Sequence, residues 1–181
     1  MKILLHICCA PCSIYPVETL RQTGHDLRGY FYNPNIHPYL EFEKRLSTLK
    51  AYASKIELPL IIDDQYELQE FLRSIVFRET ERCRICYYLR LRKTAQIAKH
   101  GKFDAFSTTL LVSPFQKQEL IKEIGKVIAQ EIGIEFYGPD FRLGFKTGVL
   151  KSKAEKMYRQ QYCGCIFSEA ERYQLSKKSS R

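Results

Sequence analysis

The residues of this 181-residue sequence that are most able to do chemistry are its seven cysteines, and they are unevenly spread. They form three compact groups: Cys8, Cys9 and Cys12; Cys83 and Cys86; Cys163 and Cys165. An odd number argues against a closed disulfide framework. Cysteines that only fill a core are usually scattered as small buried hydrophobes. Three groups, each near the expected end of a helix or strand, favour ligation of metal by thiolates.

Cys83 and Cys86 lie three residues apart at the expected start of a helix, so both sulfurs share one face. The positive end of the helix, together with Arg82 and Arg84, favours the thiolate form. The pair could bind one metal, or it could form a redox-active disulfide of the thioredoxin type. The spacing alone does not choose between these alternatives.

Cys163 and Cys165 flank Gly164. A spacing of two places both sulfurs on one side of an extended segment. The glycine removes a side chain that would crowd an approaching cluster. Chance proximity in a loop is the alternative, but ligation is favoured because a disulfide at this spacing closes a strained ring.

Cys8 and Cys9 are neighbours, and neighbouring residues on a strand point to opposite faces. They can bind one centre only where the strand breaks, and Pro11 is expected to impose that break. In the alternative, Cys8 belongs to the core and only Cys9 and Cys12 form a pair.

The number of thiols bears on the kind of metal. A structural zinc site takes four ligands, and an iron–sulfur cluster takes up to four thiolates. Seven thiols exceed one zinc site and fall short of two. The surplus suggests a second metal beside a cluster, or a cluster with one iron left open as a Lewis acid.

The elements that must position these groups follow from hydrophobic periodicity and from Gly and Pro punctuation. We predict strands at 2–8, 27–32, 59–62, 103–109 and 134–137, and helices at 15–23, 39–55, 66–75, 83–100, 116–132, 149–159 and 167–176. Residues 138–148 are predicted to be a loop. The alternation predicts a single α/β domain over residues 1–181, with a parallel sheet and a helical C-terminal part. If the first and fourth strands are neighbours, the loops after strands one, two and four line one crevice.

Composition limits the possible partners and compartments. The formal net charge is +9, and the basic end LysLysSerSerArg extends that bias, so a polyanionic partner is expected. No apolar run reaches the length of a membrane span. The basic and then apolar start is too short for a secretory signal, so we expect a protein of the reducing cytoplasm with free thiols.

Five segments, taken in order, carry a resemblance to a known family. They are HisIleCysCysAlaProCys at 6–12, TyrAsnProAsnIleHisPro with GluPheGluLysArg at 32–45, GluArgCysArgIleCysTyr at 81–87, PheSerThrThrLeuLeuValSerPro at 106–114 and TyrCysGlyCysIlePheSer at 162–168. Together they span nearly the whole chain, and as a set the chain resembles the QueH-type epoxyqueuosine reductases.

The resemblance implies the last step of queuosine biosynthesis. An epoxide on the cyclopentane ring of a modified wobble base is reduced to an alkene with release of water, without cobalamin. The substrates are tRNAs with GUN anticodons, those for Tyr, His, Asp and Asn. The implied fold is Rossmann-like and is similar to the nucleotide α-hydrolase (HUP) domain. In those relatives a Gly-rich loop after the first strand holds pyrophosphate; here CysCysAlaProCys takes its place, so no ATP use is expected.

The resemblance also implies the cofactors, a 4Fe–4S cluster and an adjacent mononuclear iron or zinc, and it extends the metal role to all seven cysteines. Relatives can place an aspartate at the position of Cys12. We assign Cys163 and Cys165 partly to the second metal. Because a cluster passes single electrons, a ferredoxin or a flavodoxin is the expected reductant.

Further residues are candidates for protons and substrate. The candidate proton donors are Tyr32, His37 and Tyr87, which could instead be a strand-end core residue, a turn residue and a packing residue. Asn33 and Asn35 could read a flipped base, or serve only as turn residues. Ser107, Thr108 and Thr109 could donate to cluster sulfides or a phosphate, or cap a strand end.

Basic side chains are the candidates for tRNA contact, namely Arg82, Arg84, Arg90 and Arg159. Glu41 and Arg45, four apart, could pair on a helix. Two alternative functions remain open on sequence alone: a zinc-stabilised tRNA-binding module without redox chemistry, and a thiol–disulfide oxidoreductase that uses Cys83 and Cys86.

Overall fold

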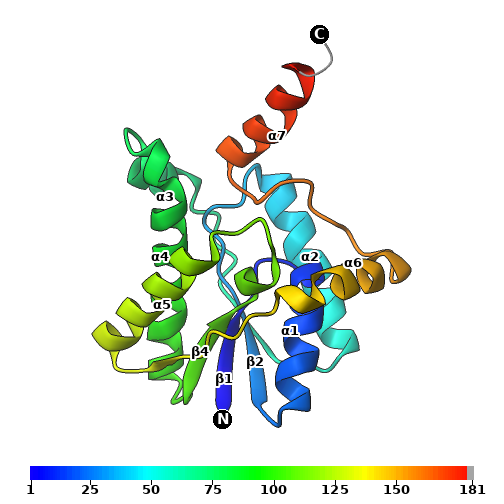
Figure 1. Cartoon of the computed structure of the whole chain (residues 1–181), viewed down its shortest axis with the longest axis vertical. Coiled ribbons are helices and arrows are strands. Elements are labelled where there is room, and N and C mark those ends of the chain that lie inside the picture. Colours follow the sequence, from blue (N-terminus) through cyan, green and yellow to red (C-terminus); the bar gives the residue numbers. More distant parts are fainter. Residues whose placement is uncertain (179–181) are drawn as a thin grey trace.

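Five parallel strands form one sheet at the centre of the molecule (Figure 1). The computed structural model describes the backbone of residues 1–178 and the side chains of residues 1–174. The strand order is β3-β2-β1-β4-β5, with bounds β1 Lys2–His6, β2 Asp26–Phe31, β3 Leu60–Ile62, β4 Ala105–Thr108 and β5 Glu135–Phe136. The basic end of the chain, LysLysSerSerArg, lies outside the residues whose side chains are described.

The middle of the sheet is buried on both faces. Ile3, Leu4 and Leu5 of β1 are completely buried, as expected for a parallel strand covered by helices on both sides. In Figure 1, α1 (Ala10–Gln22) and α2 (Tyr39–Lys55) cover one face, while α4 (Arg82–His100) and α5 (Gln118–Ile132) cover the other. The predicted parallel α/β fold is confirmed.

The remaining helices lie around this core. α3 (Leu68–Ile75) contacts α4, and α6 (Phe145–Ala154) packs against α1. α7 (Ile166–Lys178) projects from the body of the molecule at the carboxyl end of the strands (Figure 1). Three short 3-10 helices complete the fold: η1 (Glu79–Glu81), η2 (Thr109–Val112) and η3 (Arg142–Gly144).

The order of the strands brings distant segments together. β1 pairs with β2 on one side and with β4 on the other, so that Leu5 lies between Gly29 and Ser107. The chain therefore leaves β1 toward α1 on one face and enters β4 from the other. The condition set out from the sequence, that the first and fourth strands are neighbours, is met, and the loops that follow β1, β2 and β4 emerge at the same edge.

Two helices, α1 and α6, differ from the prediction by more than two residues. The first helix begins at Ala10 rather than at residue 15, because Pro11 occupies the first turn, where a missing N–H costs little. Pro16 lies inside the helix, so residue 16 has no N–H to donate to the carbonyl of Cys12. The helix predicted at 149–159 is α6, which starts at Phe145 within the predicted loop and ends at Ala154.

No helix in the described part of the chain is both long enough and apolar enough to cross a membrane.

Candidate metal centre

Three thiols converge where β1 gives way to α1. Cys9 is the N-cap residue of α1 with an extended backbone, and Cys12 lies in the first turn, so the change from strand to helix turns all three side chains inward. The Sγ atoms of Cys8 and Cys9 are 3.8 Å apart, and all three sulfurs lie within 4.8 Å of one another. Two thiolates on a tetrahedral ion with bonds of about 2.3 Å would be separated by about the same distance. We call Cys8, Cys9 and Cys12 the thiol triad.

The pKa values of the three triad thiols are shifted in opposite directions. Hydrogen bonds from Cys12 and Cys9 lower the pKa of Cys8 well below its ordinary value. Burial raises the pKa of Cys9, and the hydrogen bond to Cys8 raises that of Cys12. The first proton therefore leaves easily and the next two do not. A bound metal ion supplies the charge that stabilises the remaining thiolates.

Two neighbouring polar side chains hold the triad in place. The hydroxyl of Thr109, the first residue of η2, accepts from the backbone N–H of Cys8 at 3.2 Å and donates to its sulfur at 3.5 Å. Gln160 donates from Nε2 to the sulfur of Cys12 at 3.5 Å. The triad therefore has support from the loop after β4 and from the segment before α7.

The other four cysteines surround a cavity. Cys83 and Cys86 from the first turns of α4, and Cys163 and Cys165 from the segment before α7, line a space of about 230 Å³. Among the described residues, the triad is the only set of three or more possible ligand groups whose atoms all lie within 4.8 Å. The four sulfur atoms therefore line a cavity and are not all within ligand distance of a single ion. We call this space the cysteine cavity.

Contacts of the cavity thiols come from α4, from the loop before α5 and from α7, where the hydroxyl of Ser168 lies 3.5 Å from the sulfur of Cys165. Buried Arg90 donates from its guanidinium to the sulfur of Cys86 at 3.0 Å, one turn away on α4. Gln116 donates from Nε2 to the sulfur of Cys163 at 3.3 Å and accepts from the hydroxyl of Tyr87 at 2.8 Å. Each of these two sulfurs therefore has a hydrogen-bond donor in the protein.

Burial raises the pKa values of both cysteines of α4. It raises the pKa of Cys86 to about 12, although the nearby Arg90 acts in the opposite direction. It also raises the pKa of Cys83, against the charges of Lys117 and Arg82. The positive end of the helix and the neighbouring arginines were predicted to favour the thiolate form; Arg82 does lower the pKa of Cys83, but desolvation is the larger effect.

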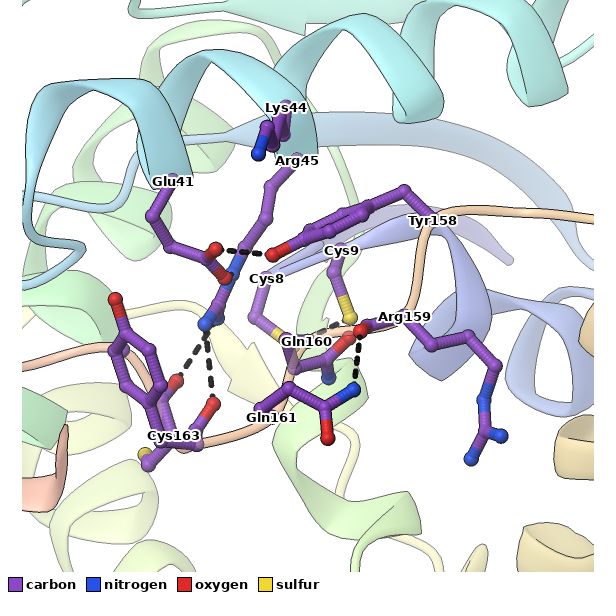
Figure 2. A network of polar contacts seen from close by, with 12 residues as sticks. Cys8, Cys9, Glu41, Lys44, Arg45, Tyr158, Arg159, Gln160, Gln161 and Cys163 are labelled. Carbon is purple, nitrogen blue, oxygen red and sulfur yellow. Dashed lines mark hydrogen bonds and ion pairs between the residues drawn. The ribbon is translucent and has the colours of Figure 1, made fainter. Parts of the chain in front are cut away.

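A buried arginine ties the segment before α7 to the rest of the molecule (Figure 2). Arg45 of α2 pairs with Glu41 at 2.7 Å and donates to the carbonyl oxygens of Tyr162 at 3.0 Å and Cys163 at 2.9 Å. The hydroxyl of Tyr158 donates to the other oxygen of Glu41. The pairing of Glu41 with Arg45 was predicted. The burial of this pair, and the hydrogen bonds from Arg45 to the distant segment around CysGlyCys, were not predicted.

The same segment packs against the loop that follows β2. The amide of His37 donates to the carbonyl of Gly164 at 2.8 Å. Gly164 has φ +147, and a Cβ at this position would lie 2.9 Å from Nδ2 of Asn35 and 3.2 Å from Cγ1 of Ile36. Glycine is therefore needed here for close packing on the 33–37 loop.

Unpartnered polar atoms indicate that the cysteine cavity is suited to a ligand. Asn35 is 1% exposed, lines the cavity, and has no hydrogen-bond partner for either amide atom within the described chain. Nε of Arg82, which also lines the cavity, is likewise buried and unpartnered there. Buried polar groups are rarely left unsatisfied in folded proteins. Four thiols together with free polar atoms fit the thiolate and sulfide chemistry of an iron–sulfur cluster.

Of the three predicted proton donors, only Tyr87 lines the cavity, and burial raises the pKa of its phenol. Tyr32 donates instead to Glu67 at 2.9 Å, at the end of β2. His37 is buried against Tyr66 and Phe71, with Nε2 3.1 Å from the carbonyl of Pro34.

The predicted substrate-binding polar residues are all buried, and they have different neighbours. Asn33 donates to the carbonyl of Ile7 at 3.0 Å, so it joins the loops after β1 and β2. Thr108 contacts His6 at 2.9 Å, and Ser107 has no hydrogen-bond partner in the described chain. Of the predicted substrate-binding amides and hydroxyls, only Asn35 lines the cavity.

The four predicted tRNA-binding arginines lie in different parts of the structure. Arg82 lines the cavity and pairs with Glu171, while Arg84 lies outside it and pairs with Glu123 at 2.9 Å. The guanidinium of Arg159 points away from the cysteines in Figure 2. Arg90 is 1% exposed, which does not fit the predicted contact with RNA. Its charge acts on Cys86, Cys163 and Cys8, which places it beside both groups of thiols.

Several residues of the site were not predicted. Gln116 and Gln160 carry no sequence signal that distinguishes them from surface glutamines. Lys117 and Ser168 also line the cavity. The one available signal was proximity, because each of these four residues lies within five positions of a recognisable motif or cysteine.

Comparisons with known proteins agree with this geometry. Residues 3–171 match the family model described as "Epoxyqueuosine reductase QueH". A protein of that name from Dehalococcoides mccartyi is 36% identical over 172 residues, which cover 95% of this chain and 94% of the relative. One from Thermotoga maritima is 35% identical over 188 residues, which cover 99% and 96%.

A solved structure supports the fold. It is described as a predicted subunit of a tRNA methyltransferase from Methanocaldococcus jannaschii, with a TM-score of 0.58 and 13% identity, covering 100% of this chain and 89% of that one. At this identity the likeness shows a shared Rossmann-like architecture and nothing further. The extent of the family match and the identities to its members together show that this chain belongs to the epoxyqueuosine reductase QueH family.

Proposed function

We propose that this chain reduces the epoxide of epoxyqueuosine in tRNA to the alkene of queuosine. The reaction consumes two electrons and two protons, breaks both C–O bonds of the epoxide and releases the oxygen as water. The observation that carries the proposal is the pairing of the cysteine cavity with the thiol triad, within a chain of this family. Seven thiols in two adjacent groups are the ligands that a reductive metal centre requires.

The two groups of thiols suit different metals. The cysteine cavity, with four thiols around a space, fits a 4Fe–4S cluster, which takes up to four thiolates. The triad, with sulfurs within 4.8 Å, fits one mononuclear iron or zinc ion. When bound, the cluster supplies single electrons and the adjacent ion supplies a Lewis acid toward the epoxide oxygen. This assignment differs from the expectation that Cys163 and Cys165 belong partly to the second metal.

The protein itself holds the groups and supplies protons. Arg90 and Arg45 place positive charge beside both sets of thiols, which offsets the negative charge that thiolates and electrons bring. Tyr87 lines the cavity, and its hydroxyl donates to Gln116 at 2.8 Å and accepts from the amide of Lys117 at 3.3 Å, so we assign it as a proton donor oriented by these two contacts. Asn35 has both amide atoms free to bind a substrate in the cavity.

The substrate and partners follow from the family. We propose tRNAs with GUN anticodons, for Tyr, His, Asp and Asn, as substrates, and a ferredoxin or flavodoxin as the one-electron donor. A net charge of +9 suits a phosphate-rich partner. We propose the cytoplasm as the compartment of the reaction, because the proposed partners belong there.

The test is anaerobic purification with reconstitution of the cluster, followed by nucleoside analysis of tRNA that carries epoxyqueuosine. We expect a brown protein, equal iron and acid-labile sulfide in the cluster fraction, and conversion to queuosine with a strong chemical reductant. A colourless protein that binds only zinc would favour the zinc-stabilised tRNA-binding module. A brown protein that fails to convert the nucleoside would contradict the proposed reaction.

The thiol–disulfide alternative is tested by the cysteines that it does not use. An oxidoreductase based on Cys83 and Cys86 should keep its activity when Cys163 is replaced by alanine. We expect this variant to lose both the cluster absorbance and the conversion of epoxyqueuosine. All seven cysteines are free in the structure.

A further inference from the structure

An exposed aromatic ring stands at the wall of the cysteine cavity. Phe115 is 84% exposed, yet it lines the same cavity as the four cysteines. A large apolar side chain that is left this open costs hydration free energy and contributes almost nothing to the core. Because Phe115 lies beside the candidate metal site, its exposure suggests a role in binding rather than in packing.

The ring of Phe115 packs on one side against a second aromatic ring. Phe145, which begins α6, packs against it edge to face, with ring centroids 5.8 Å apart at an interplanar angle of 80°. The backbone around it is also anchored, because the amide of Phe115 donates to the hydroxyl of Ser113 at 3.3 Å and the amide of Gln116 donates to the Ser113 carbonyl at 3.2 Å. A ring fixed on one side and exposed over most of its surface is ready to accept a flat partner.

The neighbours of Phe115 are polar or basic. Gln116 bonds to Cys163, and the amide of Lys117 donates to the hydroxyl of Tyr87 at 3.3 Å, so the loop is tied to the cavity. The side chains of Lys117 and Lys146 are exposed close to the two rings in sequence. An open aromatic face with cations beside it is the arrangement that binds unpaired bases, because the ring stacks on the base and the cations bind phosphate.

We propose that Phe115 is the stacking platform for an unpaired base of the substrate RNA at the mouth of the cysteine cavity, with Lys117 binding an adjacent phosphate. The proposal rests on the proposed function, since it takes the substrate to be an RNA with an unpaired loop. A base stacked on Phe115 would lie at the edge of the cavity and direct its ring substituent toward the thiols. Stacking is tolerant of sequence, so Phe115 contributes affinity and placement rather than base identity.

The first test measures the affinity of the reconstituted protein for an anticodon stem–loop RNA, with Phe77 as the matched control. Phe77 is 94% exposed but does not line the cavity. Removing a stacking ring should weaken binding by roughly 5- to 100-fold in Phe115→Ala. Phe77→Ala should bind as the parent does. Cluster absorbance, measured on the same samples, should be equal in all three proteins.

The salt dependence of binding separates stacking from charge. Phe115→Ala should keep the slope of log affinity against log salt, because stacking releases no counterions. Lys117→Ala should lower that slope by about one. A Phe115→Ala variant that loses affinity through a changed slope would contradict the stacking role.

The absence of tryptophan from the chain provides a direct reporter. Phe115→Trp introduces the only tryptophan, and its fluorescence should change when the stem–loop binds, whereas that of Phe77→Trp should not. Unchanged fluorescence and unchanged affinity at position 115, in a protein that still converts epoxyqueuosine, would overturn the platform and leave the proposed function standing. A parent protein that neither binds the RNA nor converts it would overturn both.

One further outcome identifies a different partner. If Phe115→Ala binds RNA normally but accepts electrons more slowly from a reduced ferredoxin or flavodoxin, the ring belongs to a docking surface for the reductant. That result would also overturn the stacking platform.

Discussion

The thiol triad and the cysteine cavity are both built from cysteines, but they arrange the sulfur atoms differently. The triad is built almost entirely from one five-residue stretch, Cys8 to Cys12, at the junction of β1 and α1. The cavity joins Cys83 and Cys86 of α4 to Cys163 and Cys165, more than seventy residues later in the chain. A short stretch holds its sulfurs at the spacing of one ion, whereas two distant segments can enclose a larger space.

The two sites also differ in what keeps them together. Backbone geometry places the triad, with Thr109 and Gln160 as secondary supports. The cavity depends on the docking of residues 162–165, which Arg45, His37 and the packing around Gly164 maintain. The triad should therefore tolerate damage to tertiary contacts better than the cavity does, and the following predictions test that difference.

The largest effect is expected from removing one half of the cavity. The double variant Cys163→Ala, Cys165→Ala should lose essentially all cluster iron and acid-labile sulfide, because two thiolates do not hold a cluster. The triad should still bind one metal ion, measured by elemental analysis after reconstitution. Equal loss of metal from both sites would show that the two groups form a single centre.

Breaking the buried ion pair should have the next largest effect. Arg45→Ala leaves Glu41 buried without its cation, which should lower the free energy of unfolding by about 3–5 kcal/mol. Urea denaturation of the metal-free protein measures this loss. Arg45→Lys keeps the positive charge but lacks the guanidinium group that donates to two carbonyl oxygens. This variant should therefore recover only part of the stability.

Removing Arg45 should also affect the cysteine cavity more than the thiol triad. In Arg45→Ala, the cluster should load poorly because the 162–165 segment is released, while the triad loses only a neighbouring charge and should keep more of its metal ion. A variant with normal cluster content would show that the segment docks without this anchor, and it would weaken the contrast between the sites.

Crowding the CysGlyCys turn should have a smaller effect. In Gly164→Ala, the new Cβ meets Asn35 and Ile36 and the residue must hold a positive φ, at a cost of about 1–3 kcal/mol. Thermal unfolding and cluster absorbance measure the result. Gly24→Ala is the matched control, since Gly24 also has a positive φ but a Cβ there meets nothing within 4 Å. Equal cluster loss in both variants would exclude the packing explanation.

The smallest effect is expected at the support of the triad. Thr109→Val removes the hydroxyl that donates to Cys8 and should weaken metal binding at the triad by roughly 10-fold. Competition with a chelator of known affinity measures the change. The cluster in the cysteine cavity should be unaffected, because Thr109 does not line it.

Local rules predicted most of the fold. The helix at 39–55 has the predicted bounds, and the five strands lie where the apolar runs indicated, because periodicity and Gly or Pro punctuation act over a few residues. The start of α1 was missed because Pro11 was expected to break the strand, whereas in the structure it also lies in the first turn of the helix, where proline is well tolerated.

The sequence by itself determined the strand and helix order, the parallel sheet, the three cysteine groups and the family they indicate. Only the tertiary structure decided that the thiols divide into three and four, that Arg90 faces sulfur rather than RNA, and that Arg45 clamps a segment over one hundred residues away. Periodicity and spacing report on neighbours along the chain. Burial and partnership depend on which surfaces the fold brings into contact, and the desolvation that follows sets the ionisation of the cysteines.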